Sequence, residues 1–164
     1  MSAKVVAYDS SYVRAAVEVW NEVVRDGIAF PQEDELDLTT GDEFFRAQSF
    51  TGLAVDESGD VLALYILHPN NVGRCAHIAN ASYAVRSDMR GRHLGELIVK
   101  HSIDTARELG FRILQFNAVV ATNVHARHLY RRLGFTELGT IPEGFRMPDG
   151  SYADIVPQYI TIRN

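Results

Sequence analysis

The sequence predicts an α/β (α+β) fold in which helices flank a mixed, largely antiparallel sheet. Two β-rich runs, residues 50–58 and 61–68, are separated by Gly59-Asp60, a hairpin signal that predicts antiparallel pairing. A strand, a helix and a second strand then follow over residues 75–120, the pattern of a crossover connection. The remaining segments place a strand and two helices before the hairpin, and a helix and two β segments after the crossover.

Length and composition predict a single globular domain. The chain has 164 residues, of which 46% are hydrophobic and 23% are charged, close to the average of globular proteins. It contains no repeat, no low-complexity segment and no Pro/Gly-rich linker. We therefore expect residues 1–164 to form one domain.

The net charge and the length of the apolar runs indicate where the protein is located and which partners it binds. The 16 Lys and Arg residues against 21 Asp and Glu residues give a net charge of -5, which argues against nucleic acid as a partner. The longest apolar run, residues 61–67, is far shorter than the roughly 20 residues of a membrane-spanning helix, and the N-terminus lacks the apolar stretch of a secretory signal. A single cysteine, Cys75, fits a reducing compartment. The expectation is a cytoplasmic protein that binds neither nucleic acid nor membrane.

A short strand and a helix are predicted at the start of the chain. Apolar residues recur at helical spacing over residues 13–24, so the helix should follow a cap at Asp9 or Ser10 and end near Gly27. Trp20 lies on the apolar stripe and is expected in the core.

An acidic, loop-like segment follows over residues 28–41 and contains Pro31. Loops of this length often form lids or contact substrates, and a solvated loop is the alternative. A short helix is expected around Asp42 to Gln48, before the hairpin.

The crossover is predicted from three consecutive segments. Residues 75–87 form a β pattern, and residues 90–110 form a helix whose apolar stripe is interrupted by polar side chains at positions 101, 102 and 105. Residues 111–120 are apolar on both faces, as expected of a strand covered by helices on both sides.

A last helix and two β segments complete the chain. The helix is expected to begin at Asn123 and to end before Gly134, with an apolar stripe toward the core. Residues 135–146 and 151–162 are each expected to form one β segment, and Pro157 indicates an edge or a bulge in the last one.

The junction over residues 83–95 is suited to hold an anion. A strand end, a turn rich in Arg and Gly and a helix N-terminus follow one another there, and the first-turn N–H groups of a helix are unpaired and lie at the positive end of its dipole. Phosphate or pyrophosphate is the expected ligand, and a solvated turn is the alternative. The junction is neither a Walker loop nor a dinucleotide fingerprint, so nucleotide hydrolysis and hydride transfer lose support. Its cationic residues are Arg86, Arg90, Arg92 and His93, and its glycines are Gly91 and Gly95.

Two motifs, one at this junction and one in the last helix, carry family information. The first reads Arg-Gly-Arg-His-Leu-Gly over residues 90–95, and the second reads Asn-x-x-Ala-x-x-Leu-Tyr-x-x-x-Gly-Phe over residues 123–135. Together they resemble the GNAT superfamily of acetyl-CoA-dependent N-acetyltransferases, over roughly residues 50–141. The second motif matches fully. In the first, His93 stands where the family's pyrophosphate loop has a glycine.

The resemblance implies a fold and a cofactor. It implies a GNAT-like sheet with a splayed strand pair, and acetyl-CoA as acyl donor without a metal. Backbone groups at the strand end are implied to pair with the pantetheine arm, and one N–H to polarise the thioester carbonyl. The implied cofactor-binding residues are Ala84, Val85, Arg86, Arg90, Gly91, Arg92, His93, Leu94, Gly95, Glu96, Asn123 and Tyr130.

Tyr130 and Asn123 each have a functional and a structural explanation. Tyr130 lies where family members protonate the departing thiolate, and it also fits the apolar stripe of its helix. Asn123 is implied to contact the cofactor, and N-capping alone would also explain it.

Asparagines in two predicted strands are candidates for binding the substrate that accepts the acetyl group. Asn117 interrupts a strand predicted to be buried on both faces, where an amide without partners is costly, so it should have a partner. Asn80 shares a strand face with Ser82 and is directed to the same region. The surrounding runs are similar to the yeast azetidine-2-carboxylate N-acetyltransferase branch of the family, which implies that Asn80, Asn117 and Asn123 serve substrate and cofactor. Asn80 and Asn117 are expected to bind the substrate, and Asn117 is also expected to be catalytic. The catalytic role of Tyr130 is implied by the wider family, and Tyr130 is one place where the yeast branch differs. Hydrogen bonds between strands are the alternative, and Phe30 is expected to help close a substrate pocket.

The predicted reaction is direct acetyl transfer from acetyl-CoA to the amine of a small molecule, such as an amino or imino acid like azetidine-2-carboxylate. The sequence has no nucleophile elbow, so a covalent acyl-enzyme is not expected. A base must take a proton from the attacking amine, and His68, His77, Glu33, Asp34 and Glu35 are the open options. A peptide or protein N-acetyltransferase and a non-catalytic acyl-CoA-binding module are the alternatives.

Three further features complete the predictions. Cys75 with His77, and His125 with His128, lack other convincing ligands, so no metal is expected. The cationic stretch Arg127 to Arg132 is expected to be a solvated helix face or a grip on the 3′-phosphate side of coenzyme A. A homodimer, with the C-terminal strands as candidate interface, is a family expectation.

Overall fold

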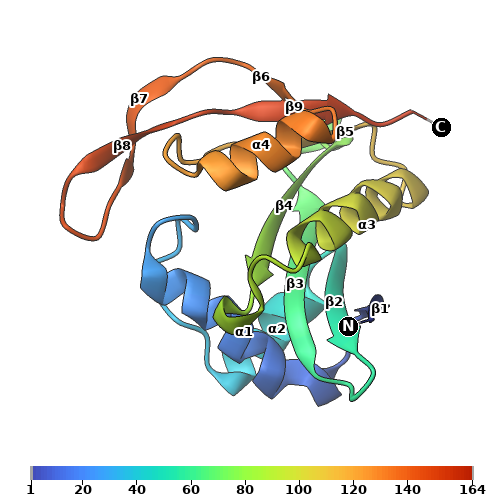
Figure 1. The fold of residues 1–164 in the computed structure, drawn as a ribbon. Helices are drawn as coiled ribbons and strands as arrows, with labels where there is room; N and C mark the ends of the chain where they lie inside the picture. Colours follow the sequence, from blue (N-terminus) through green and yellow to red (C-terminus); the bar gives the residue numbers. More distant parts are fainter. Residues whose placement is uncertain (1, 164) are drawn as a thin grey trace.

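The computed structural model describes residues 2–163 and has the predicted architecture of a mixed sheet between helices (Figure 1). The strands are β1 (Ala3–Ala7), β2 (Phe50–Asp56), β3 (Val61–Pro69), β4 (Ile78–Val85), β5 (Ile113–Phe116), β6 (Thr136–Glu137), β7 (Ile141–Arg146), β8 (Tyr152–Ile155) and β9 (Gln158–Thr161). Within the described residues, seven of them form one sheet in the order β1-β2-β3-β4-β5-β9-β6. All neighbours in it are antiparallel except β4 and β5, and β7 pairs separately with β8.

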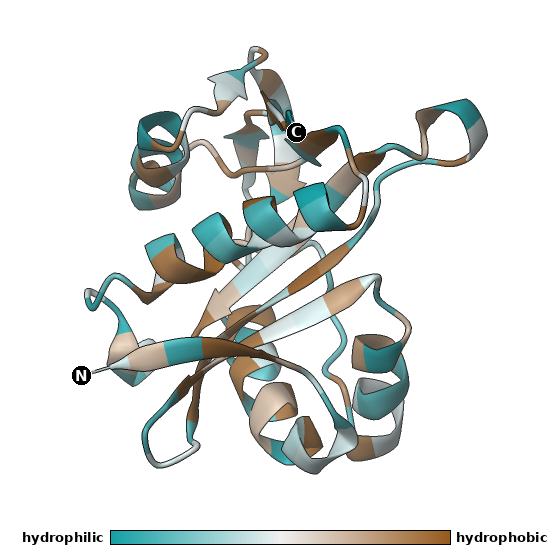
Figure 2. Ribbon diagram, turned by 90° about the vertical axis from the view of Figure 1, so that its right-hand side faces the viewer, coloured by the Kyte–Doolittle hydropathy of each residue, from teal (hydrophilic) through white to brown (hydrophobic). Residues whose placement is uncertain are grey.

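Helices cover both faces of the sheet. The α-helices are α1 (Val13–Asp26), α2 (Leu38–Arg46), α3 (Leu94–Glu108) and α4 (Val124–Arg132), and short 3-10 turns occupy Ser10–Tyr12, Gly73–Cys75 and Ser87–Met89. Residues of α1 and α2 pack on one face, and residues of α3 and α4 pack on the other. The hydrophobic side of each helix turns inward and the hydrophilic side turns outward (Figure 2). No helix in residues 2–163 has both the length and the apolar character needed to cross a membrane.

Two apolar clusters hold these layers together. Trp20, which is 1% exposed, lies at the α1 side against the rings of Phe30 and Phe45, which confirms its place in the core. Ile98 and Leu114, both fully buried, belong to the cluster under α3. Because both faces of the sheet are covered, β2 and β3 are apolar almost without alternation.

The polar residues on the inner face of α3 have partners in the sheet. Oγ of Ser102 lies 2.7 Å from the hydroxyl of Tyr83. The Tyr65 hydroxyl lies 3.0 Å from Oγ1 of Thr105 and 2.8 Å from Nδ1 of His101. Each interruption of the apolar stripe therefore faces a tyrosine, which supplies the hydrogen bond that a buried polar group requires.

Helix ends follow the local sequence. As predicted, α1 ends at Gly27, which takes the left-handed conformation with φ of 66°. The second helix begins earlier than the predicted start at Asp42. Asp37 accepts hydrogen bonds from the N–H groups of Thr39 and Thr40. Oγ1 of Thr40 accepts a hydrogen bond from the N–H of Asp37, which completes a capping box.

The C-terminal region differs from the prediction of two β segments. It forms four short strands, β6 to β9. Gly139, with φ of 134°, lies between β6 and β7, and Pro157, which has no N–H, separates β8 from β9 rather than lying inside one strand. The hairpin of β7 and β8 forms an arm that projects from the main sheet (Figure 1).

The strand predicted over residues 111–120 is also shorter than expected. Only Ile113–Phe116 forms β5, its burial alternates, and Asn117 is exposed beyond its end. The prediction of a strand buried on both faces is wrong here, because β5 soon separates from its neighbour β4.

This separation opens the sheet. Parallel pairing joins Ile78 to Ile113 and Ala79 to Leu114, and no further β4–β5 pair follows in the described residues. By contrast, β4 stays paired with β3 from Ala79 to Val85. The predicted splayed strand pair is therefore present.

Candidate active site

A cavity of about 320 Å³ lies where β4 and β5 diverge. Its walls come from β4, the residues after β5, α3, α4 and the loop after α1. Residues that line it include Phe30, Pro31, Asn80, Ser82, Tyr83, Gly95, Phe116, Asn117, Asn123 and Tyr130.

The cavity takes residues from both faces of the sheet. Tyr83 packs in the cluster under α3, whereas Ala84 packs in the cluster under α1. Because side chains alternate along a strand, Asn80 and Ser82 belong to the α1 face. The opening is therefore lined by side chains from both faces of the sheet.

Backbone groups of β4 are exposed at this opening. The N–H of Arg86 donates to the carbonyl of Leu62 on β3 at 2.9 Å. Since backbone groups alternate in direction along a strand, those of Ala84 also face β3, and those of Tyr83 and Val85 face the opening. Of the three strand-end residues predicted to pair with the cofactor, Val85 alone directs its backbone to the opening.

The loop before α3 has the geometry of an anion site. The first helical hydrogen bond runs from the N–H of Leu97 to the carbonyl of His93 at 3.2 Å, so the preceding N–H groups have no helical acceptor. Gly91 and His93 both take the left-handed conformation, with φ of 77° and 60°. His93 thus follows a backbone path natural to glycine, at a cost of roughly 1–2 kcal/mol.

Part of the positive charge predicted for this loop is compensated. Arg86 makes two hydrogen bonds to Asp88, at 2.6 and 3.2 Å, and the first of these contacts lowers the pKa of Asp88. Nη2 of Arg90 lies 3.2 Å from Oδ2 of Asp26 at the end of α1. Glu96 is paired with Lys100 and Arg132. Of the loop arginines, Arg92 alone has no ion pair within residues 2–163.

Tyr130 combines a partly buried ring with a free hydroxyl. Its ring centroid lies 4.7 Å from that of Phe116 and 5.5 Å from that of Phe135. Its hydroxyl makes no hydrogen bond within the described part of the chain, and the residue lines the cavity. Burial raises the pKa of Tyr130 above the ordinary value of about 10, so the phenol keeps its proton at neutral pH.

Asn80 and Asn117 come together from different strands. Nδ2 of Asn117 lies 2.7 Å from Oδ1 of Asn70, and Nδ2 of Asn80 lies 3.2 Å from the same oxygen. Gln115 donates to Oδ1 of Asn117 at 3.1 Å. Asn117 thus has the partner predicted for it, but at an exposed strand end.

Asn123 caps α4, as considered for it, and it also faces the cavity. Its Oδ1 accepts a hydrogen bond from the N–H of Ala126 at 3.2 Å, which caps α4. The cap explains the asparagine structurally and leaves its Nδ2 for a ligand.

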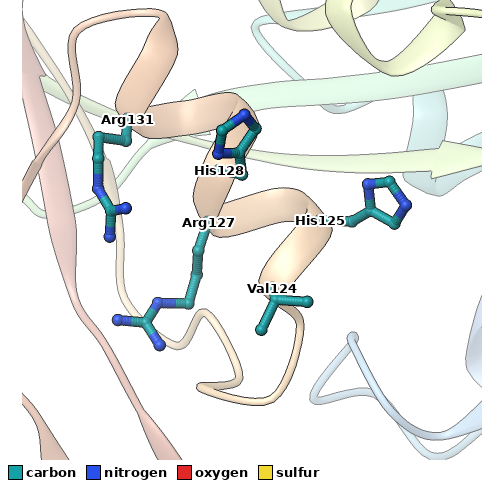
Figure 3. Close-up of a pocket in the computed structure, with 5 residues that line it drawn as sticks. All are labelled: Val124, His125, Arg127, His128 and Arg131. Atoms are coloured by element: carbon teal, nitrogen blue, oxygen red, sulfur yellow. The ribbon is translucent and has the colours of Figure 1, made fainter.

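The outer surface of α4 carries a second hollow, of about 490 Å³, lined by cationic and histidine side chains (Figure 3). Arg127 and Arg131 extend to one side of the helix and His125 to the other (Figure 3). Arg127 makes two hydrogen bonds to Glu137, at 2.9 and 3.0 Å, and Arg131 lies 3.5 Å from the same carboxylate. Glu137 therefore compensates part of the charge of this face and ties α4 to β6.

His68 lies on the acceptor side of the sheet. It is the cross-strand partner of Asn80, and its Nδ1 lies 2.9 Å from the carbonyl oxygen of Pro69. A carbonyl oxygen only accepts, so Nδ1 carries a proton, and in the neutral ring Nε2 then carries the lone pair. His68 does not itself line the cavity, and its Nε2 makes no hydrogen bond within the described residues.

The other proposed bases are placed less favourably. His77 lines a separate cavity beside residues 110–113. Glu35 is paired with Arg25 at 2.5 Å, and Glu33 is paired with Arg146. These side chains therefore lie outside the cavity or already contact a cation.

The loop after α1 meets the β7–β8 arm. They face each other across a cavity of about 690 Å³, and Phe30 and Pro31 line both this cavity and the one between β4 and β5. Arg146 on β7 reaches Glu33 in the loop. Phe30, predicted to help close the substrate pocket, thus lies in a loop that contacts the β7–β8 arm.

The cavity gathers part of the predicted site. It brings together Phe30, Asn80, Gly95, Asn117, Asn123 and Tyr130. The residues that do not line it are Ala84, Val85, Arg86, Arg90, Gly91, Arg92, His93, Leu94 and Glu96, which lie at the end of β4 and at the start of α3. Sequence reasoning missed Asn70 and Tyr83. The alternation of β4 could have indicated Tyr83, whereas Asn70 lies in a turn without a periodic signal.

Cys75 is exposed in the turn before β4. Among residues 2–163 there is no group of three or more His, Cys, Asp or Glu side chains placed to hold a metal ion.

Comparison with known proteins gives the same assignment. The model of the acetyltransferase (GNAT) family matches residues 16–135. N-acetyltransferase aca1 of Schizosaccharomyces pombe is 32% identical over 94 residues, which are 57% of this chain and 45% of that protein. The chain thus spans less than half the length of this relative.

Two further proteins are similar over most of their length. L-methionine sulfoximine/L-methionine sulfone acetyltransferase of Pseudomonas paraeruginosa is 28% identical over 149 residues, covering 87% of this chain and 86% of that protein. The structure of a GCN5-related N-acetyltransferase from Kribbella flavida superimposes with a TM-score of 0.89 at 33% identity, covering 97% of both chains. The chain belongs to the acetyltransferase (GNAT) family.

Proposed function

We propose that residues 1–164 form one acetyltransferase domain that transfers the acetyl group of acetyl-CoA directly to the amine of a small molecule. The observation that carries the proposal is the cavity between β4 and β5, which has the free hydroxyl of Tyr130 toward α4 and the asparagine amides toward α1. The name of the Pseudomonas relative, whose acceptors are amino-acid derivatives, supports an amino or imino acid as acceptor.

The α3 side fits acetyl-CoA. The N–H groups before Leu97 have no helical acceptor, Arg92 adds positive charge, and the ring of His93 adds an N–H donor, which together suit a pyrophosphate. Val85 directs backbone groups to the opening, where an extended pantetheine arm would pair as an added strand. The bound donor supplies a thioester carbonyl at the opening.

The α1 side fits a small amine that carries a carboxylate. Asn80 and Asn117 offer neutral N–H donors, which bind a carboxylate without adding charge. Phe30 and Pro31 close this side and restrict the size of the acceptor. Azetidine-2-carboxylate is an acceptor of this kind.

The reaction requires two proton movements. The amine nitrogen attacks the thioester carbon, so a C–N bond forms and the C–S bond breaks. The amine proton passes through water to Nε2 of His68, and the hydroxyl of Tyr130 donates a proton to the departing sulfur. Tyr130 then regains a proton from solvent.

The release of free coenzyme A thiol from acetyl-CoA tests this proposal. The panel contains azetidine-2-carboxylate, L-proline, L-methionine sulfoximine, polyamines and short peptides. Because Cys75 is exposed and would react with a thiol reagent, the assay uses Cys75→Ser protein.

We expect release with one or more of the amino or imino acids. Release with peptides alone would replace the small-molecule acceptor by a peptide. If no amine gives release while acetyl-CoA binds in calorimetry, the chain is an acyl-CoA-binding module and the proposed reaction is wrong.

A further inference from the structure

We propose that Asn70 is a positioning residue that prepares the acceptor site for an α-amino or imino acid, an inference that rests on the proposed function. Asn70 follows β3 directly and does not line the cavity. Its Oδ1 nonetheless accepts hydrogen bonds from two side chains that do, Asn80 at 3.2 Å and Asn117 at 2.7 Å.

Asn70 joins the two walls of the cavity. The backbone ladder between β4 and β5 stops at Ala79 and Leu114, so Asn80 is the first residue of β4 beyond the ladder. Asn117 follows the last residue of β5. The oxygen of Asn70 therefore connects the two strands where backbone hydrogen bonds no longer do.

Asn70 is itself held in place. Its backbone N–H donates to the carbonyl of Ile78 at 2.7 Å, which closes the turn between β3 and β4. Its side-chain oxygen thus projects from a fixed backbone position, and a turn residue defines the spacing of two strands.

The contacts also define which atoms of the amides are free. An amide oxygen only accepts, so Asn80 and Asn117 must each turn the nitrogen to Asn70. Oδ1 of Asn117 is occupied by Gln115. What remains is a second N–H on each of the two amides, and Oδ1 of Asn80, which has no partner in the described residues.

These free atoms match the two ends of an α-amino or imino acid. Two N–H donors from opposite walls suit the two oxygens of a carboxylate. Oδ1 of Asn80 suits an N–H of the acceptor amine. Without Asn70, the amide of Asn80 loses the one hydrogen bond that the described residues give it, so it could rotate by half a turn and present oxygen where the carboxylate needs a donor. Asn117 would keep only its contact with Gln115.

Steady-state kinetics with azetidine-2-carboxylate test the inference. We expect Asn70→Ala to raise the KM for this acceptor about tenfold, since two hydrogen bonds that fix its donors are lost. The KM for acetyl-CoA, which binds at the α3 side, should stay unchanged. Asn71→Ala is the matched control, because Asn71 is the neighbouring asparagine and its Oδ1 contacts only the N–H of Val72. This control should keep wild-type values of both constants.

Asn70→Asp separates positioning from a merely structural role. The aspartate keeps an oxygen that accepts from both amides and adds a negative charge behind them. With azetidine-2-carboxamide, which has no carboxylate, Asn70→Asp should therefore have the wild-type KM, unlike Asn70→Ala. The KM for azetidine-2-carboxylate should stay raised.

The outcomes distinguish the inference from the proposed function. If the wild-type protein releases no coenzyme A with any amine, the proposed function fails and the inference fails with it. If the wild-type protein is active and Asn70→Ala keeps the wild-type KM, or raises the KM of acceptor and acetyl-CoA together, the inference alone is wrong. Should Asn70→Ala not fold, equal effects of Asn70→Asp on the carboxylate and the carboxamide would overturn it.

Discussion

The hydroxyl of Tyr83 lies 2.7 Å from Oγ of Ser102, whereas the hydroxyl of Tyr130, whose ring centroid is 6.3 Å from that of Tyr83, has no hydrogen-bond partner within residues 2–163. Burial raises the pKa of both tyrosines, so both are protonated at neutral pH. Ser102 gives its own proton to the carbonyl of Val99, so Tyr83 donates to Ser102. The proton of Tyr130 is the one available to a ligand.

The two tyrosines form a matched pair of variants. Tyr130→Phe should lower kcat about 100-fold or more, the usual contribution of a general acid, with little change in the KM for acetyl-CoA. Tyr83→Phe should mainly cost stability, about 1 kcal/mol for the lost hydrogen bond. Steady-state kinetics and urea unfolding of both proteins check this. Equal values of kcat for the two variants would remove Tyr130 as the acid.

Replacing His93 by glycine should stabilise the protein. His93 has φ of 60°, a conformation that glycine adopts without strain. We expect His93→Gly to raise the free energy of unfolding by about 0.5–1 kcal/mol after the larger chain entropy of glycine is included. His93→Ala, which keeps a Cβ, is the control and should give no gain. A destabilised His93→Gly protein in urea unfolding would show that the imidazole makes contacts worth more than the strain.

Two substitutions separate the roles of Asn123. Asn123→Ala removes the cap of α4 and should lower the free energy of unfolding by about 1 kcal/mol. Asn123→Asp keeps an oxygen that accepts the N–H of Ala126, so its stability should stay near wild type. Because the aspartate loses the N–H donor and adds negative charge, its affinity for coenzyme A in calorimetry should fall. Unchanged affinity of Asn123→Asp would reduce Asn123 to a cap.

The burial of His101 predicts a loss of stability in acid. Desolvation lowers the pKa of His101 below its ordinary value of about 6.5. The unfolded chain therefore binds this proton more readily than the folded one. The stabilisation is fully present above the pKa that His101 has in the unfolded chain. It is lost as the pH falls through the lower pKa that His101 has in the folded protein.

Urea unfolding at about pH 8 and about pH 5 measures this loss. His101→Gln should show a smaller decrease in the free energy of unfolding between the two pH values than the wild type. His125→Gln, on the exposed surface of α4, should keep the wild-type decrease. If His101→Gln shows the full decrease, other groups cause the acid sensitivity.

Much of the fold was predictable because its signals are local. The hairpin at Gly59-Asp60, the end of α1 at Gly27 and the start of α4 at Asn123 each depend on neighbouring residues. The start of α2 was missed because the cap at Asp37 precedes a polar first turn with little apolar periodicity. The division of the C-terminal segments into four strands depends on which strand finds a partner in space, which periodicity does not encode.

The site was predictable in its residues and less so in its contacts. The two motifs and the strand asparagines led to Asn80, Asn117, Asn123 and Tyr130, which the fold gathers at one cavity. The pairing of Arg90 with Asp26 joins segments far apart in the sequence, and no local sequence pattern predicts it. The oxygen shared by Asn80 and Asn117 belongs to a turn residue, and its role depends on the divergence of two strands.

The short ladder between β4 and β5 also bears on how the molecule folds and unfolds. Two residue pairs join β1–β4 to the β5, β9 and β6 half of the sheet. In the first half, β2, β3 and β4 follow one another in the sequence, whereas β9 must return after α4 and β6 to β8 to reach β5, a contact with a higher entropic cost. The C-terminal half should therefore form later and open more often, with faster amide hydrogen exchange in β5 and β9 than in β2 and β3. The same divergence that opens the cavity is then the boundary between two cooperative units.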